Sequence, residues 1–167
     1  GPAVAPSSPV ILATVGVGGN PAGREASNAA VQTLARVLKK LPNGEHKLRP
    51  AILDAVEEAN KTVLGLARGA ATTLVVAQLD ATGLRSYHVG DSELLAVGQR
   101  GRIKQRVVPH SPTGFAVEAG LLDEDEAVQH HQRHVLFNVI GSSEMRVEVG
   151  PALQLAARDT VLLASDG

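Results

Sequence analysis

The chain has 167 residues, of which 16 are basic and 17 acidic, and its formal net charge of -1 excludes the strongly basic surface typical of nucleic-acid binding. It contains no cysteine, which excludes disulfides, thiol catalysis and thiolate zinc sites. Its apolar runs fall far short of the roughly 20 residues that a membrane helix needs, so we expect no membrane contact. The absence of cysteine and of a targeting signal predicts a cytoplasmic location.

The length predicts one domain with a substantial hydrophobic core, and no internal repeat divides it. Residues 1–9 carry no charged side chain and no targeting pattern, so we expect a flexible lead-in there. Residues 10–167 then form a single domain of the α+β class.

The N-terminal third predicts a strand, a glycine loop and two helices. Residues 10–14 are β-branched and aliphatic, and they run into a loop rich in glycine at 16–23. A helix begins at Pro21, shows one apolar stripe and ends before Pro42. A second amphipathic helix is opened by Pro50, and the two helices should pack side by side on an apolar surface.

The rest of the chain predicts mainly strands. Short turn signals separate four strand-like runs, which favours an antiparallel meander over 72–79, 84–89, 93–97 and 103–108. Asp123 and Glu126 have the spacing of a capping box and predict a short helix over 124–131. Further strands are expected at 147–149, 153–156 and 160–164.

Three motifs favour ordinary structural roles. The glycine loop fails the dinucleotide pattern because Pro21 occupies the third glycine position, and it fails the P-loop pattern at Arg24 and Glu25. We therefore interpret it as a strand-to-helix turn. The serine in Gly-Asp-Ser at 90–92 lacks a downstream Asp-x-x-His pair that could activate it. Histidines at 130, 131 and 134 lack the glutamate of a metalloprotease helix, so we expect a solvated segment.

Six motifs taken in order resemble the type 2C metal-dependent protein phosphatase family. They are ATVGVGGNPAG at 13–23, GAATTLVVA at 69–77, HVGDS at 88–92, PHS at 109–111, VIG at 139–141 and LASDG at 163–167. The segment 114–134 also resembles the flap beside that family's active site. The resemblance covers nearly the whole chain and implies a four-layer α-β-β-α sandwich of two mainly antiparallel sheets flanked by helix pairs.

The resemblance also implies a chemistry and a set of residues. In the family, carboxylates hold two magnesium or manganese ions, which activate a water for attack on phosphoserine or phosphothreonine. By motif position, Asp166 matches a metal-binding aspartate and Asp91 an aspartate near an additional metal position, while Gly16 matches a glycine whose backbone carbonyl holds a metal. Val15 stands where the family has the aspartate that bridges both ions, and its isopropyl group cannot ligate a hard cation.

Two other family segments have no counterpart here, one before residue 10 and one after the Ser-Asp-Gly motif, so we expect an incomplete domain from a longer protein. Three hypotheses remain open. The domain is a degenerate phosphatase that binds a phosphoprotein or a regulatory partner, or it is an active phosphoserine/phosphothreonine hydrolase with further ligands elsewhere, or it is a metal-free interaction module.

Overall fold

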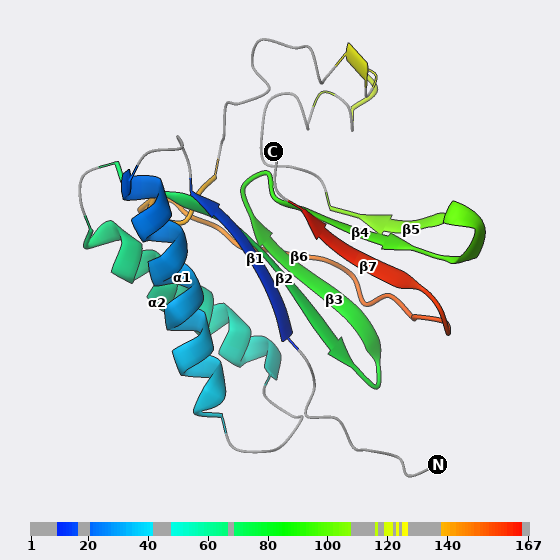
Figure 1. Cartoon of the computed structure of the whole chain (residues 1–167), viewed down its shortest axis with the longest axis horizontal. Helices are drawn as coiled ribbons and strands as arrows, with labels where there is room; N and C mark the ends of the chain where they lie inside the picture. Colours follow the sequence, from blue (N-terminus) through cyan, green and yellow to red (C-terminus); the bar gives the residue numbers. More distant parts are fainter. Residues whose placement is uncertain are drawn as a thin grey trace.

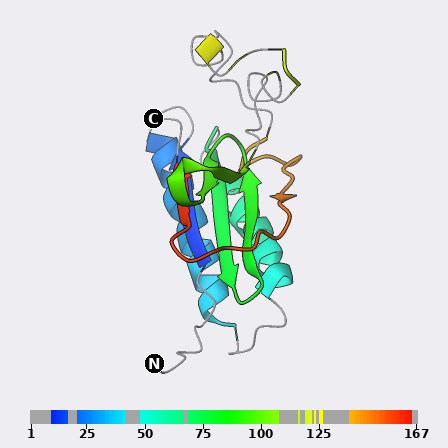
Figure 2. The same ribbon diagram turned by 90° about the vertical axis from the view of Figure 1, so that its right-hand side faces the viewer.

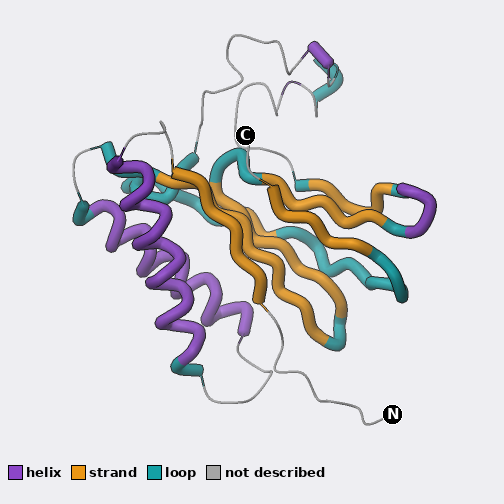
Figure 3. The backbone as a smooth tube through the Cα atoms, in the orientation of Figure 1, coloured by secondary structure: helices purple, strands orange, loops and turns teal. Residues whose placement is uncertain are grey.

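The computed structural model describes residues 10–16, 21–41, 48–66, 69–107 and 138–164, together with 116, 119–121, 123, 125 and 126. The elements in chain order are β1 (Val10–Gly16), α1 (Pro21–Lys39), α2 (Leu48–Leu64), β2 (Thr72–Asp80), β3 (Gly83–Val89), β4 (Glu93–Val97), the 3₁₀ helix η3 (Gln99–Gly101), β5 (Ile103–Arg106), β6 (Glu148–Val149) and β7 (Thr160–Ala164). Figure 3 shows their distribution along the backbone.

Two antiparallel sheets and one helix pair form three layers. The first sheet has the strand order β1-β2-β3-β6, and the second has the order β5-β4-β7. The helices α1 and α2 pack together and cover the face of the first sheet that points away from the second (Figure 1). Seen from the side of the second sheet, the helices lie behind both sheets (Figure 2). The α+β class and the face-to-face sheets are thereby confirmed, whereas a second helix pair is not among the described elements.

The helix layer is held by an apolar stripe of small and aliphatic side chains. Ala26, Ala30 and Leu34 recur every fourth residue of α1 and are fully buried. They join one core cluster with the buried face of α2 and with Leu74, Val76 and other residues of the first sheet. The expectation that the two helices pack on the following strands is confirmed.

Strand β2 is the centre of the domain because both of its faces are buried. Leu74 and Val76 face the helices, and the alternating residues Val75 and Ala77 face the second sheet. The latter belong to a second core cluster that includes Leu94 and Ala96 of β4 and Leu84 of β3. The uninterrupted apolar run of β2 follows from this position, since a strand between two layers has no solvent face.

The predicted four-strand meander is wrong at one connection. Strands β2 and β3 form a hairpin in the first sheet, and β4 and β5 form a hairpin in the second. The chain crosses from one sheet to the other at 90–92, where a simple turn was expected. The physical reason is burial: residues 89–92 are all buried, as a link between packed layers must be, whereas hairpin turns normally lie at the surface.

Other local expectations meet mixed outcomes. The capping box is confirmed, because the backbone N–H of Glu126 donates to Oδ1 of Asp123 and the N–H of Asp123 donates to Oε2 of Glu126. The second helix begins at Leu48 and not at Pro50. The strand expected at 153–156 is wrong, since only Leu153 forms an isolated bridge, to Leu84. None of the described helices has the length and apolarity that a membrane crossing requires.

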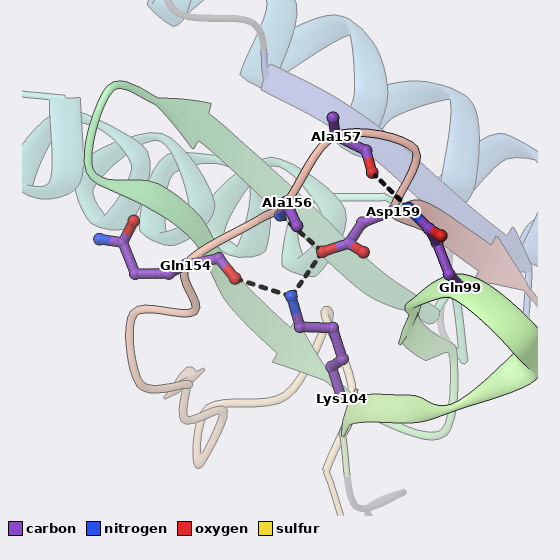
Figure 4. A network of polar contacts seen from close by, with 6 residues as sticks. All are labelled: Gln99, Lys104, Gln154, Ala156, Ala157 and Asp159. Atoms are coloured by element: carbon purple, nitrogen blue, oxygen red, sulfur yellow. Dashed lines mark hydrogen bonds and ion pairs between the residues drawn. The ribbon is translucent and has the colours of Figure 1, made fainter.

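A polar network fixes the turn that leads into β7 (Figure 4). Lys104 Nζ donates to Oδ2 of Asp159 at 2.5 Å and to the carbonyl oxygen of Gln154 at 3.0 Å. The N–H of Ala156 donates to the same carboxylate at 2.7 Å, and the Asp159 side chain is only 4% exposed. The hydrogen bond from Lys104, followed by that from Ala156, lowers the pKa of Asp159 below its usual value. The network therefore ties β5 to the start of β7.

This network predicts a dependence of stability on acid. Because the folded-state pKa of Asp159 is lowered, its contribution is complete above the unfolded pKa of about 3.9 and disappears as the pH falls through the folded value. The variant Asp159→Asn should therefore lose less free energy of unfolding than wild type between about pH 5 and pH 2. Urea unfolding across that range measures the difference.

The variant Asp54→Asn, in which an exposed residue of α2 loses one negative charge, is the control for the change in net charge. Some acid dependence remains in Asp159→Asn, because hydrogen bonds led by that from Thr82 also lower the pKa of Asp80. Identical slopes for wild type and Asp159→Asn would contradict the network's role.

Candidate functional site

Three strand ends meet at one edge of the two sheets. The last residues of β1 pair with the first of β2, so that Val15 lies opposite Thr73. The last residue of β3, Val89, pairs with Leu74 near the start of β2. The last residue of β7, Ala164, pairs with Glu93 at the start of β4. In Figure 1 these strand ends all lie at the upper ends of the two sheets. Antiparallel pairing thus brings together the end of β1, the start of β2, the link between β3 and β4, and the end of β7.

Asp91 lies in the link that crosses between the sheets at this edge. Asp91 is 8% exposed. Gly90 before it has a φ of 95°, in the left-handed region that residues with a side chain rarely adopt. A β-carbon on Gly90 would lie 2.7 Å from Cγ2 of Thr73 and 2.9 Å from its Cβ. Glycine is therefore required both by the backbone angle and by the close approach of β2.

A buried pair of hydroxyls fixes the other side of Asp91. Oγ1 of Thr73 lies 2.5 Å from Oγ of Ser92, and the two residues are 2% and 1% exposed. Either oxygen can donate, since each hydroxyl is both donor and acceptor. This bond connects the first sheet to the residue that immediately precedes β4.

One asparagine side chain holds the neighbouring segment 138–146 against the same edge, and a second closes that segment on itself. Asn60 of α2 accepts from the N–H of Gly141 at 2.6 Å and donates to the carbonyl of Ser142 at 2.9 Å. Asn138 accepts from the N–H of Arg146 at 3.1 Å and donates to its carbonyl at 2.6 Å. Backbone hydrogen bonds between Thr72 and Ile140 complete the attachment.

The structure brings some of the residues singled out from the sequence together. Gly16 ends β1 opposite Thr72, Val15 is its neighbour in the same strand, and Asp91 lies in the link between the sheets. Asp166 lies outside the described residues, two positions after Ala164 at the end of β7. The three histidines near 130 and most of the flap-like segment 114–134 also lie outside them, as do residues 1–9.

The described part of the chain does not by itself fit a two-metal centre. It contains no group of three or more His, Cys, Asp or Glu side chains placed to hold a metal ion. Of the carboxylates predicted as metal ligands, it includes Asp91 alone. One carboxylate gives fewer oxygen ligands than Mg²⁺ or Mn²⁺ requires from a protein site that bridges two ions.

Three residues of this edge were missed by the sequence reasoning as site components: Thr73, Asn60 and Asn138. Thr73 falls within the family-like segment 69–77, but a threonine in an apolar strand is typical of any sheet. Asn60 could have been noticed as an amide beside the apolar stripe of its helix. No spacing rule connects it to Gly141, 81 positions away.

The protein phosphatase 2C model matches residues 3–167, and the chain therefore belongs to the protein phosphatase 2C family. It is 28% identical to a protein named serine/threonine phosphatase stp from Listeria welshimeri, over 96% of this chain and 67% of that protein. It is 30% identical to protein phosphatase PhpP from Streptococcus pneumoniae, over 95% and 66% respectively. The chain thus spans about two thirds of the length of these relatives.

Solved structures agree with this assignment. The serine/threonine phosphatase of S. agalactiae superposes with a TM-score of 0.82 at 28% identity, over 95% of this chain and 68% of that one. The Mycobacterium tuberculosis phosphatase PstP/Ppp gives a TM-score of 0.78 at 24% identity, over 94% and 68%, and supports the fold alone. The predicted family and the predicted fold class are both confirmed.

Asn60 should stabilise this edge measurably. In Asn60→Ala the N–H of Gly141 and the carbonyl of Ser142 lose their partner, and the free energy of unfolding should fall by about 1–3 kcal/mol. Urea unfolding checks the value. The control Ser27→Ala removes an exposed hydrogen bond to Arg24 and should change stability by less than about 0.5 kcal/mol. Equal effects of the two substitutions would contradict the role of Asn60.

Proposed function

We propose that this chain is a type 2C serine/threonine phosphatase domain that recognises phosphoserine or phosphothreonine in proteins and has weakened turnover. It then acts in phosphoprotein binding or in regulation through a protein partner. Membership of the protein phosphatase 2C family and the names of the relatives support the substrate class. The residue at position 15 supports the weakened turnover.

The observation that carries the proposal is the place of Val15 in the sheet. Its backbone lies opposite Thr73, whose hydroxyl contacts Ser92 beside Asp91. Position 15 is thus connected to the neighbourhood of Asp91 in two steps. The first is its backbone pairing with Thr73, and the second is the hydrogen bond between Thr73 and Ser92. Valine has no side-chain oxygen with which to bind Mg²⁺ or Mn²⁺. Asp91, Asp166 and the carbonyl of Gly16 are the ligands that we propose remain.

A specific observation also favours an active enzyme as the second candidate. Asp91 keeps the aspartate of the family-like motif at 88–92, and it lies 8% exposed in the link where the strand ends meet. In this alternative the remaining ligands lie beyond the described residues, and Asp166 is one of them.

The substitution Val15→Asp tests the proposal directly. We expect it to increase Mn²⁺ affinity by more than about 10-fold, because a direct carboxylate ligand should matter at least as much as the outer-shell partners of known metal sites. Turnover of a phosphothreonine peptide should rise in parallel. Calorimetric titration of Mn²⁺ and a phosphate-release assay on wild type and variant give the two values.

The variant Val15→Asn is the matched control, since its side chain has the size of aspartate without the charge, and Asp166→Asn tests the other proposed ligand. Unchanged Mn²⁺ affinity in Val15→Asp would show that the alignment of the glycine loop is wrong. Wild type could instead show rapid Mn²⁺-dependent turnover that Asp166→Asn abolishes and Val15→Asp does not increase. That result would contradict weakened turnover and favour the active enzyme.

A further inference from the structure

We infer that Thr73 is a positioning residue that holds the Asp91 carboxylate in place, acting through Gly90 and Ser92 on either side of it. The inference rests on the proposed role of Asp91 in the site. Thr73 touches no substrate in this account. Its function is to determine where the link between the two sheets runs.

The first contact is with the residue after Asp91. The hydroxyl oxygens of Thr73 and Ser92 are 2.5 Å apart, and both residues are almost completely buried. Water cannot readily replace either partner at such burial, so loss of one hydroxyl costs the other its hydrogen bond in a medium of low dielectric. The bond therefore defines the position of Ser92 relative to β2.

The second contact is with the residue before Asp91. The side chain of Thr73 packs so closely on Gly90 that a β-carbon there would come within 2.7 Å of Cγ2. The carbonyl oxygen of Asn138 lies 3.3 Å from the same point. Gly90 is therefore confined between β2 and the segment that begins at Asn138, and its φ of 95° turns the chain toward the second sheet.

The third contact makes the arrangement rigid. The backbone of Thr73 pairs with Val15 in β1 on one side, within a strand that also pairs with β3 on the other. A β-branched side chain such as threonine has few accessible rotamers. The hydroxyl and the methyl group of Thr73 are thus fixed by the sheet, and they fix residues 90 and 92 in turn.

Two substitutions separate these contacts. Thr73→Val keeps the shape and the methyl contact with Gly90 but removes the hydroxyl, whereas Thr73→Ser keeps the hydroxyl and loses the methyl group. Thr82→Val is the matched control, because Thr82 also donates its hydroxyl to a side chain, that of Asp80, at the opposite end of the same hairpin.

The first measurement is amide hydrogen exchange in the full chain without metal. Thr73→Val should accelerate amide exchange at residues 90–92, in the link after β3, by about 10-fold relative to the amides of β3 itself. Thr73→Ser should restore most of the protection. Thr82→Val should leave residues 90–92 at wild-type rates. If Thr73→Val does not fold, Ser92→Ala removes the same hydrogen bond from its other end. It should then accelerate amide exchange in the link to the same extent.

The second measurement is Mn²⁺ affinity by calorimetry, with Asp91→Asn as the reference for loss of the carboxylate. Thr73→Val should weaken binding by about 10-fold, as outer-shell residues do in metal sites, and Thr73→Ser should weaken it less. Unchanged exchange in Thr73→Val would overturn the inference. Where wild type binds Mn²⁺, faster exchange in Thr73→Val with unchanged Mn²⁺ affinity would also overturn it, because Thr73 would then stabilise the link without positioning Asp91.

The two proposals fail in different ways. If wild type binds no Mn²⁺, the metal role proposed for Asp91 fails, and the exchange data alone then decide whether Thr73 positions the link. If wild type and Asp91→Asn differ in Mn²⁺ affinity but wild type and Thr73→Val do not, the proposed function stands and the inference about Thr73 is wrong.

Discussion

The hydrogen bond between Thr73 and Ser92 is the interaction on which the arrangement of this edge depends. It joins the central strand of the first sheet to the start of the second, at the point where the chain changes layers. Because Gly90 packs directly on the same threonine, the link has little freedom on either side of Asp91. The site and the contact between the sheets therefore share the link at residues 90–92. A substitution that changes one of them should also change the other.

The rest of the domain supports that element through the burial of β2. Its two faces belong to two separate core clusters, one with the helices and one with the second sheet. Burial of aliphatic side chains on both faces gives about 1.5–3 kcal/mol for each large residue, which offsets the burial of the polar groups at the strand's start. At the other end of the second sheet, Lys104 and Asp159 fix the entry to β7 and so the direction in which its last residues run.

Much of this fold could be predicted from the sequence because its signals are local. The apolar stripes of α1 and α2, the strand boundaries near β4 and the capping box at Asp123 depend on neighbours within one or two turns. The change of sheet at Gly90 could not be predicted from the residues alone, since a glycine before an aspartate is equally typical of a hairpin turn. The partners of Thr73 and Asn60 are long-range and leave no spacing rule, and the family motifs identified the segments without their contacts.

The most direct test of this account is a double-mutant cycle on the free energy of unfolding with Thr73→Val, Ser92→Ala and the double variant. Two residues in direct contact through a buried bond should show a coupling energy of about 1 kcal/mol, with the double variant less destabilised than the sum of the single ones. A coupling energy near zero would contradict the claim that this bond joins the two sheets at Asp91.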